Sequence, residues 1–278
     1  TVPEKHAGRG QKLRSSSVKE YAVSQNIPVL QPTNLKNESF LAELKALEAE
    51  IQVVVAFRML PEAVWNMPKH GTFNLHASLL PQYRGSAPIN WAVINGDTSS
   101  GLTTFFINNH IDTGNIIFQE KTKIEAEDNA GILHDKMMRI GSQLVCKTID
   151  AIADGTAPNI QQVGQPTQAP KIFNDTCQID WNKDIHIIHN HIRGLSPYPA
   201  AWTTLSNEKN LKVYKSSKEE RTHGAKTGSI LTDGKSHLKV AVKGGFIHLE
   251  EIQLAGKKRM SISDFLRGFQ MNETLSVR

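Results

Sequence analysis

The chain has 278 residues, 39% hydrophobic and 21% charged, so it is long enough for two domains of ordinary size, each with its own core. Its longest continuous apolar run, residues 53–57, is far too short to cross a bilayer, and we therefore do not expect a membrane-spanning protein. The two cysteines, Cys146 and Cys177, belong to no metal or redox motif, and we expect reduced thiols in a cytosolic protein.

The net charge of +5 is unevenly distributed. Residues 171–278 hold 17 Lys and Arg against 11 Asp and Glu, residues 1–20 hold five against two, and residues 21–170 hold ten against fourteen. Basic ends around a mildly acidic middle are typical of a protein that grips a polyanion at its ends while the middle does the chemistry. A basic balance that serves only solubility is the alternative.

The first half of the chain alternates between helical and extended patterns, beginning with a helix over "SVKEYAVSQ" and a short β-rich run at 27–30. The stretch "ESFLAELKALEAEI" repeats apolar residues at helical spacing, and Asn37 stands where it could cap that helix. Further strands are expected at 51–57, 72–76, 102–107 and 115–124, the first of them buried on both faces, and further helices at "SAPINWAVING" and "AGILHDKMMRIGSQLVCKTIDAIADG".

The pattern changes after Gly155, where a Pro-, Gln- and Gly-rich stretch without helical period predicts a linker. Beyond it come a helix over "DIHIIHNHIRGL" and five short strands at 201–205, 211–216, 228–232, 238–242 and 246–254. Five short strands in a basic domain are compatible with a small OB-like barrel.

Strands alternating with helices predict an α/β, Rossmann-like, mostly parallel sheet. We therefore expect a catalytic domain over residues 1–155, a linker over 156–172 and an OB-like β-barrel domain over 173–278.

A candidate active site lies at the end of the expected strand 72–76. Asn74 and His76 are two residues apart, so they point to the same face at the carboxyl end of the strand, where open α/β sheets place their ligands. The expected partner is a carboxylate, and Asp112 in "HIDTGNI" stands on a polar loop between two strands. An ordinary hydrogen-bonded histidine and an ordinary turn would give the same spacing, which leaves both interpretations open.

The segments "NLHASLLPQYRGSAPINWAVINGD" and "GLTTFFINNHIDTGNIIFQ" resemble the core of the folate-dependent formyltransferases. The motif of that family, Asn-x-His, then Ser-Leu-Leu-Pro, then a distant Asp-x-Gly, falls here on Asn74 and His76, on residues 78–81 and on residues 112–114 without departure. The segments "TVPEKHAGRGQKL", "IDWNKDIHIIHNHIRGLSPYPAAWT" and "LAGKKRMSISDFL" narrow the resemblance to the branch that formylates initiator methionyl-tRNA.

The resemblance implies transfer of the formyl group of 10-formyltetrahydrofolate to the amino group of methionine on initiator methionyl-tRNA, for the initiation of protein synthesis. It implies that His76 and Asn74 stabilise the oxyanion of the tetrahedral intermediate, and that Asp112 keeps His76 protonated and helps to move the amine proton. The residues expected to bind the folate are Ser78, Leu79, Leu80, Pro81, Met59, Leu60, Thr113, Gly114 and Asn115. No metal is expected.

Two other clusters are given no functional role. His186, His189 and His191 share no complete set of zinc ligands, and the resemblance places them on the helix that opens the second domain. The "GRG" of residues 8–10 lacks the third glycine of a dinucleotide motif.

The basic segments are expected to meet the tRNA. The family places a basic loop against the acceptor end of the tRNA, and a second basic group extends the surface of the second domain. The residues concerned are Lys5, Arg9, Lys12 and Arg14 in the first segment and Lys257 and Lys258 in the second.

The family opens with a strand, a glycine-bearing loop and a helix ahead of the basic loop, whereas this sequence begins at the loop itself. We therefore expect the catalytic domain to be incomplete at its amino end. The alternatives are a formyltransferase that acts on a small amine such as a nucleotide or an amino sugar, a formyltetrahydrofolate hydrolase, and a non-catalytic RNA-binding module. The basic segments and the second domain favour tRNA, and a cytoplasmic monomer is expected.

Overall fold

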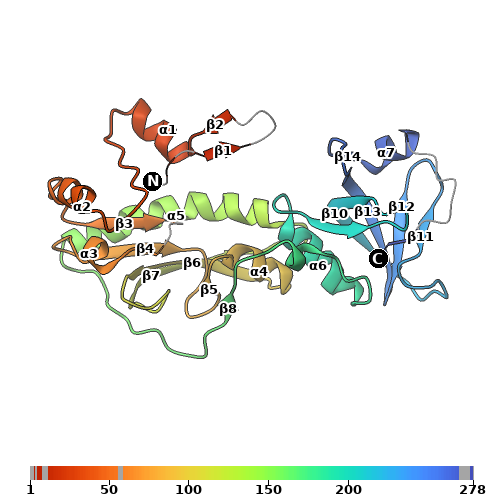
Figure 1. Ribbon diagram of the computed structural model, residues 1–278. Helices are drawn as coiled ribbons and strands as arrows, with labels where there is room; N and C mark the ends of the chain where they lie inside the picture. Colours follow the sequence, from red (N-terminus) through yellow and green to blue (C-terminus); the bar gives the residue numbers. More distant parts are fainter. Residues whose placement is uncertain (1–2, 4, 8–11, 56–58, 269–275, 278) are drawn as a thin grey trace.

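The computed structural model describes residues 3, 5–7, 12–55, 59–268 and 276–277, which form two lobes joined by a narrow waist (Figure 1). The α/β lobe comes first in the chain and the mainly β lobe second. Among the described residues, none of the helices combines the length and hydrophobicity needed to cross a membrane.

A four-stranded sheet in the order β3-β4-β6-β7 forms the centre of the first lobe. β3 (Gln52–Val55) and β4 (Thr72–His76) run parallel, whereas β6 (Ser99–Phe106) pairs antiparallel with β4 and with β7 (Ile116–Lys123). The apolar runs of the sequence predict all four strands. This sheet and its helices confirm the Rossmann-like α/β class of the first lobe. The expected mostly parallel sheet is not seen in the described part, because β4 with β6 and β6 with β7 pair antiparallel and only β3 with β4 pair in parallel.

Two details of this sheet differ from expectation. β3 is not buried on both faces, because it is the last strand of the sheet in the described part, and Val53 and Val55 are 36% and 55% exposed. Residues 27–30 form no strand. Pro28 lacks the N–H that a sheet ladder needs, and Ile27 faces solvent with 53% of its surface exposed.

Five helices surround this sheet in the described part of the first lobe: α1 (Ser17–Ser24), α2 (Glu38–Lys45), α3 (Glu62–Trp65), α4 (Pro88–Ile94) and α5 (Ala130–Ala153). The expected cap at Asn37 is confirmed, because its side chain accepts a hydrogen bond from the Phe40 N–H at 3.1 Å. The helix that it caps ends at Lys45, earlier than its apolar pattern suggests.

The long helix α5 holds the first core together. Asn129 caps it by accepting from the Ile132 N–H at 2.9 Å. Its buried positions recur every three or four residues, as an amphipathic helix requires, and they are Leu133, Met137, Gly141, Leu144, Thr148 and Ile152. At Gly141 a Cβ would lie 2.9 Å from the Leu75 side chain, so glycine lets the helix approach the sheet closely.

The second lobe is an antiparallel sheet in the order β11-β12-β13-β10-β9, with a short additional strand on β13. Its elements are α6 (Ile185–Leu195), β9 (Ala201–Thr204), β10 (Asn210–Glu220), β11 (Ile230–Thr232), β12 (Leu238–Val242), β13 (Gly245–Leu254), β14 (Met260–Ser261) and α7 (Ile262–Gly268). The buried face of α6 packs on this sheet through Ile188, Ile192 and Leu195. The antiparallel strands agree with the sequence, and the OB-like barrel stays a prediction.

The stretch expected to be a linker, residues 156–172, lies along the first lobe and is the green segment between α5 and β8 in Figure 1. Within it, β8 (Gln168–Ala169) pairs in parallel with β5 (Arg84–Gly85), and Ile160 exchanges two backbone hydrogen bonds with Ile116. A short 3₁₀ helix, η1 (Asp175–Cys177), follows.

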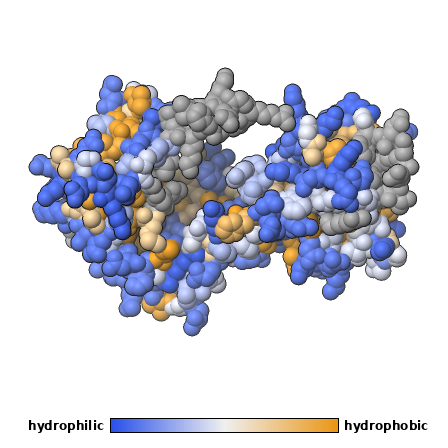
Figure 2. Space-filling model, viewed as in Figure 1, coloured by the Kyte–Doolittle hydropathy of each residue, from blue (hydrophilic) through white to orange (hydrophobic). Residues whose placement is uncertain are grey.

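The waist between the lobes is a helix crossing. α4 packs on α6 where Gly194 lets the two backbones meet, and Asn90 donates a hydrogen bond to the Gly194 carbonyl at 2.7 Å. Arg193 reaches across to the carbonyl oxygen of Asp128 at 2.8 Å. The face drawn in Figure 2 is mostly hydrophilic, with hydrophobic residues in small groups.

Candidate active site

β4 places Asn74 and His76 near the carboxyl end of a strand that lies between β3 and β6. Asn74 is paired with Phe105 and His76 with Thr103 on β6. Asp112 comes from the loop between β6 and β7. Residues far apart in the sequence thus meet because two neighbouring strands of one sheet deliver them.

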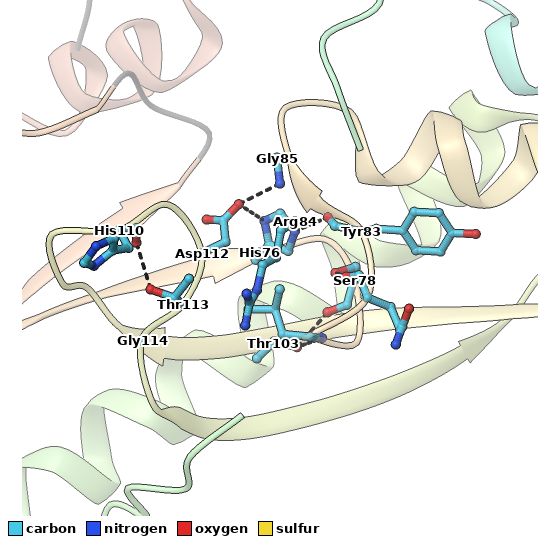
Figure 3. A network of polar contacts seen from close by, with 12 residues as sticks. His76, Ser78, Tyr83, Arg84, Gly85, Thr103, His110, Asp112, Thr113 and Gly114 are labelled. Carbon is cyan, nitrogen blue, oxygen red and sulfur yellow. Dashed lines mark hydrogen bonds and ion pairs between the residues drawn. The ribbon is translucent and has the colours of Figure 1, made fainter. Parts of the chain in front are cut away.

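The two ring nitrogens of His76 have different partners (Figure 3). Nε2 lies 2.8 Å from the carbonyl oxygen of Tyr83, and Nδ1 lies 3.7 Å from Oδ2 of Asp112. A carbonyl oxygen only accepts, so Nε2 must donate and carries a proton. Nδ1 therefore faces the carboxylate and is the nitrogen that can gain or lose a proton. The ring itself is buried, with 6% of the residue exposed.

Asp112 is held in an uncommon backbone conformation, with φ of 54°. Its Oδ2 accepts a hydrogen bond from the Gly85 N–H at 2.8 Å, so one carboxylate oxygen faces both Gly85 and His76 (Figure 3). Thr113 continues the turn by donating to Oδ1 of Asn108 at 3.0 Å. A Cβ on Gly114 would lie 1.5 Å from the carbonyl oxygen of Phe106, so this position accepts only glycine.

Asn74 has a polar atom without a partner. Among the described residues, its Oδ1 is one of the few buried side-chain oxygens that form no hydrogen bond. A buried and unsatisfied amide is costly for the folded chain, and such exceptions concentrate at functional sites. The amide lies on the same strand face as His76, so a polar group of a bound substrate fits there.

The ledge formed by Ser78, Leu79, Leu80 and Pro81 is tied to the sheet mainly through its backbone. Thr103 Oγ1 donates to the Ser78 carbonyl at 2.6 Å and accepts from the Leu80 N–H at 3.1 Å. Gln119 donates to the Leu80 carbonyl at 2.9 Å. The side chains of Ser78 and Leu80 are buried, so they shape the ledge, whereas Leu79 and Pro81 remain partly accessible.

The structure brings together most of the residues expected to bind the folate, but not all of them. Met59 and Leu60 line a hollow of about 810 Å³ together with Leu41, and its lining includes neither Asn74, His76 nor Asp112. Met59 is 72% exposed there. A role for these two residues in folate binding stays a prediction.

The basic residues expected to meet the tRNA are only partly described. Arg9 and the side chains of Lys5, Lys12 and Arg14 lie outside the described residues, although the backbone of β1 (Lys5–Ala7) pairs antiparallel with that of β2 (Lys12–Arg14). In the second lobe, Lys257 and Lys258 are exposed on the turn between β13 and β14.

Sequence reasoning missed four residues that position the site. Tyr83 offers its carbonyl oxygen to His76, and Gly85 offers its N–H to Asp112. Arg84 lies in the same loop and donates to Oε1 of Gln162 from Nε at 3.2 Å and from Nη2 at 2.6 Å. Arg84 and Gln162 thereby connect the loop with residues 156–172. The "YRG" of residues 83–85 could have drawn attention to this loop. Nothing in the sequence distinguishes Gln162 from the other glutamines near it.

Tyr83 also anchors its own loop. Its hydroxyl donates to Oδ2 of Asp97 at 2.7 Å and accepts from Asn95 at 3.1 Å. Burial, with Asp97 adding to it, raises the pKa of Tyr83 to about 12. The phenol therefore stays neutral at any ordinary pH and keeps donating.

The histidines of the second lobe have separate environments. His186 is exposed beside Lys218 and Glu220, whereas His189 is buried against Oγ of Ser216 at 3.0 Å. In the part of the chain that the structure describes, no group of three or more His, Cys, Asp or Glu side chains is arranged to hold a metal ion. Cys146 and Cys177 are both free thiols.

Comparison with known protein families decides the identity of this arrangement. The Formyl transferase family matches residues 1–149, and the Formyl transferase C-terminal domain matches residues 171–270. The chain belongs to the formyl transferase family. The two matches follow the division of the fold into an α/β lobe and a mainly β lobe.

Relatives are similar over almost the whole chain. The methionyl-tRNA formyltransferase of Bacteroides fragilis is 51% identical over 287 residues, covering 100% of this chain and 89% of the relative. The methionyl-tRNA formyltransferase of Parabacteroides distasonis is 56% identical over 281 residues, covering 97% and 87%.

Solved structures share the fold at low sequence identity. The sugar 3N-formyl transferase WlaRD has a TM-score of 0.64 and 22% identity, over 87% of this chain and 82% of that one. HypX from Aquifex aeolicus, crystallised with tetrahydrofolic acid, has a TM-score of 0.64 and 15% identity, over 85% and 42%. These likenesses support the formyl transferase fold.

Proposed function

We propose that this formyl transferase moves the formyl group of 10-formyltetrahydrofolate to the amino group of methionine on initiator methionyl-tRNA. The observation that carries the proposal is the pairing of His76 with Asp112 beside the amide of Asn74, whose Oδ1 has no hydrogen-bond partner. Relatives that are methionyl-tRNA formyltransferases match the chain at 51–56% identity over nearly its whole length.

The side chains suit attack of an amine on a formyl carbon. The folate supplies the formyl group, and attack of the amine forms the new C–N bond and places negative charge on the former carbonyl oxygen. Collapse of this intermediate then breaks the bond to the folate nitrogen, which leaves with the proton that the amine has lost. An imidazolium N–H from His76 and the amide N–H₂ of Asn74 are donors for that charge, and both come from one face of β4. Losing one such donor typically costs about 3–4 kcal/mol of barrier.

Asp112 accepts the proton that the amine loses. Its Oδ2 is anchored by the Gly85 N–H and faces Nδ1 of His76, so this carboxylate is the acceptor for a proton taken from the amine while the imidazolium donates to the oxyanion. The side chain is only 11% exposed, which limits access of bulk water to this exchange. The two groups act as a pair.

The folate is proposed to bind on the exposed parts of the ledge at Leu79 and Pro81 and along the turn at Thr113, Gly114 and Asn115. The buried Oδ1 of Asn74, which has no partner in the protein, is an acceptor for an N–H of such a ligand. Ser78 and Leu80 contribute by fixing the ledge, since their side chains are buried.

The relatives and the charge of the second lobe favour a tRNA substrate over a small amine. The methionyl-tRNA formyltransferases match at 51–56% identity, and exposed Lys257 and Lys258 lie on a basic surface suited to phosphates. Initiator tRNA is charged and used in the cytoplasm, which we propose as the location of the enzyme.

The test is transfer of labelled formyl from 10-formyltetrahydrofolate to methionyl initiator tRNA by this chain and by its His76→Ala variant. We expect transfer by the parent and a loss of at least about 100-fold in a folded variant. Transfer by the parent to a nucleotide-linked amino sugar, with none to the tRNA, would overturn the proposal in favour of a small amine.

A further inference from the structure

The turn that carries Asp112 needs support from outside itself. Asp112 has φ of 54°, a conformation that costs free energy for a residue with a side chain and that persists only when its surroundings hold it. Its carboxylate is fixed by Gly85. The backbone carbonyls of Asp112 and Gly114 are fixed by a residue 50 positions away, Gln162.

Gln162 contacts three parts of the site with one side chain. Its Nε2 donates to the carbonyl of Asp112 at 3.0 Å and to that of Gly114 at 2.8 Å. Its Oε1 accepts from Nε of Arg84 at 3.2 Å and from Nη2 at 2.6 Å. A primary amide has two N–H donors and one acceptor in a single plane, so it satisfies both carbonyls and the guanidinium together.

The burial pattern of the linker singles out the same residue. Between residues 159 and 168, every described residue except Gln162 is exposed, including Val163 at 82%. A segment that packs only one side chain inward is not held there by an apolar core. The contacts of Gln162 are therefore the specific connection at this point.

The linker also holds the other partner of Asp112. Arg84 N–H donates to the Thr167 carbonyl at 3.0 Å, and Ser86 N–H donates to the Ala169 carbonyl at 2.8 Å. Gly85 lies between them, where a Cβ would be 2.6 Å from the Ala169 oxygen. Residues 160–169 thus hold the Asp112 turn through its backbone carbonyls, and they hold Gly85 through the backbone N–H groups of its two neighbours.

We propose that Gln162 is a positioning residue for formyl transfer, because it holds the turn that presents the Asp112 carboxylate to His76. This inference rests on the function proposed above. If it holds, the segment of residues 156–172 between the two domains supports the active site by positioning the Asp112 turn, in addition to connecting the domains.

The experiment compares Gln162→Ala, Gln162→Glu and the control Gln161→Ala, whose parent side chain is exposed and adjacent. Glutamate matches glutamine in size and still accepts from Arg84, but its ionised form has no N–H for the two carbonyls. We expect kcat to fall about 10- to 100-fold in both Gln162 variants. KM for methionyl-tRNA should stay within about twofold, since Gln162 faces the turn and not the basic surface.

A second readout is independent of activity. Hydrogen exchange of the backbone amides in residues 112–116 should accelerate in both Gln162 variants and not in Gln161→Ala, because the turn loses its anchor. The melting temperature should change by no more than about 4 °C. Unchanged kcat in Gln162→Glu, unchanged exchange in the turn, or global unfolding of both variants would each overturn the assignment.

The two proposals fail differently. A parent that does not formylate the tRNA contradicts the proposed substrate, while faster exchange in the Gln162 variants still shows that Gln162 holds the Asp112 turn. A parent that formylates the tRNA, with Gln162 variants of equal kcat, contradicts the positioning role alone.

Discussion

One ring nitrogen of His76 forms a hydrogen bond to a backbone carbonyl, whereas the other faces a carboxylate at a longer distance. Nε2–H donates a hydrogen bond to the Tyr83 carbonyl at 2.8 Å, so any change in protonation has to occur at Nδ1. Nδ1 faces Asp112 at 3.7 Å, longer than a hydrogen bond. Hydrogen-bond distances of this kind often tighten only when a substrate is bound.

The charge of Asp112 can be removed without changing its shape. The Asp112→Asn variant keeps an oxygen for the Gly85 N–H but no longer attracts a proton to Nδ1 of His76. We expect kcat to fall about 100-fold or more, with the variant still folded because the Asn oxygen keeps the hydrogen bond from the Gly85 N–H. Formyl-transfer kinetics and chemical unfolding test the two expectations, and activity within about threefold of the parent would contradict the role of the carboxylate.

At this scale the sequence predicts side chains better than backbone groups. Asn74 and His76 follow from the two-residue period of a strand, and Asp112 from a carboxylate in a tight turn. The Tyr83 carbonyl and the Gly85 N–H have no such signal, because every residue but proline carries both groups. Gln162 was hidden for a related reason, since a glutamine in a polar segment usually faces solvent.

Among the elements, the start of β7 depends on one glycine. An alanine at position 114 would place its Cβ 1.5 Å from the carbonyl oxygen of Phe106 at the end of β6, whose N–H donates to the carbonyl of Asn115 in the turn at 3.0 Å. We expect Gly114→Ala to lower the free energy of unfolding by about 3 kcal/mol or more, because backbone and not a flexible side chain has to move. Gly224→Ala, with nothing within 4 Å of the new Cβ, should leave the same measurement unchanged.

The packing of α6 on β10 should weaken in acid. Burial, assisted by the positive charges of Lys218 and Arg193, lowers the pKa of His189 to about 4, while Glu250 acts in the opposite direction. The unfolded chain binds this proton at an ordinary pKa near 6.5, so it holds more protons than the folded chain between about pH 6.5 and 4. The stabilisation is complete above about pH 6.5 and is lost as the pH falls through this window.

We expect a loss of up to about 3 kcal/mol by about pH 4 from this residue. Unfolding measured between about pH 7 and 4 should show a shallower slope for His189→Gln than for the parent. His186→Gln is the matched control, since His186 lies on the same helix but is exposed. Equal slopes for His189→Gln and the parent would contradict the assignment.

The longer elements were predictable because their periodicity extends over many residues. α5 shows a buried stripe from Leu133 to Ile152, and β13 a run of ten residues. The two-residue strands β5, β8 and β14 were not predictable, since two residues establish no period. They form because a distant segment supplies the pairing, which is a tertiary property.

Over the whole molecule, basic charge gathers on the second lobe, whose residues 171–278 hold 17 basic against 11 acidic groups. If Lys257 and Lys258 each meet a phosphate, Lys257→Ala with Lys258→Ala should weaken tRNA binding and reduce the slope of log affinity against log salt by roughly 1.5. Filter binding at several salt concentrations measures that slope. Lys45→Ala, exposed at the end of α2, should leave it unchanged, and an unchanged slope in the double variant would contradict the phosphate contacts.

Composition predicts a domain boundary after Gly155, because the Pro- and Gln-rich stretch there interrupts every period. The crossing of α4 on α6 was not, since it depends on the missing side chain of Gly194 and on two helices far apart in the sequence. Nor could the sequence indicate that the stretch between the lobes lies against the first one.

That course of the chain gives the first lobe two different ends. The last buried residue of its hydrophobic clusters is Ile152 on α5, but the hydrogen bonds that hold the loop of Gly85 extend to Ala169. A gene rearrangement that exchanged the second domain at residue 155 would keep those clusters but lose the anchor of the catalytic turn. One that joined after Pro170 would keep both, so the segment that recombination has to preserve is longer than the segment that supplies the buried clusters.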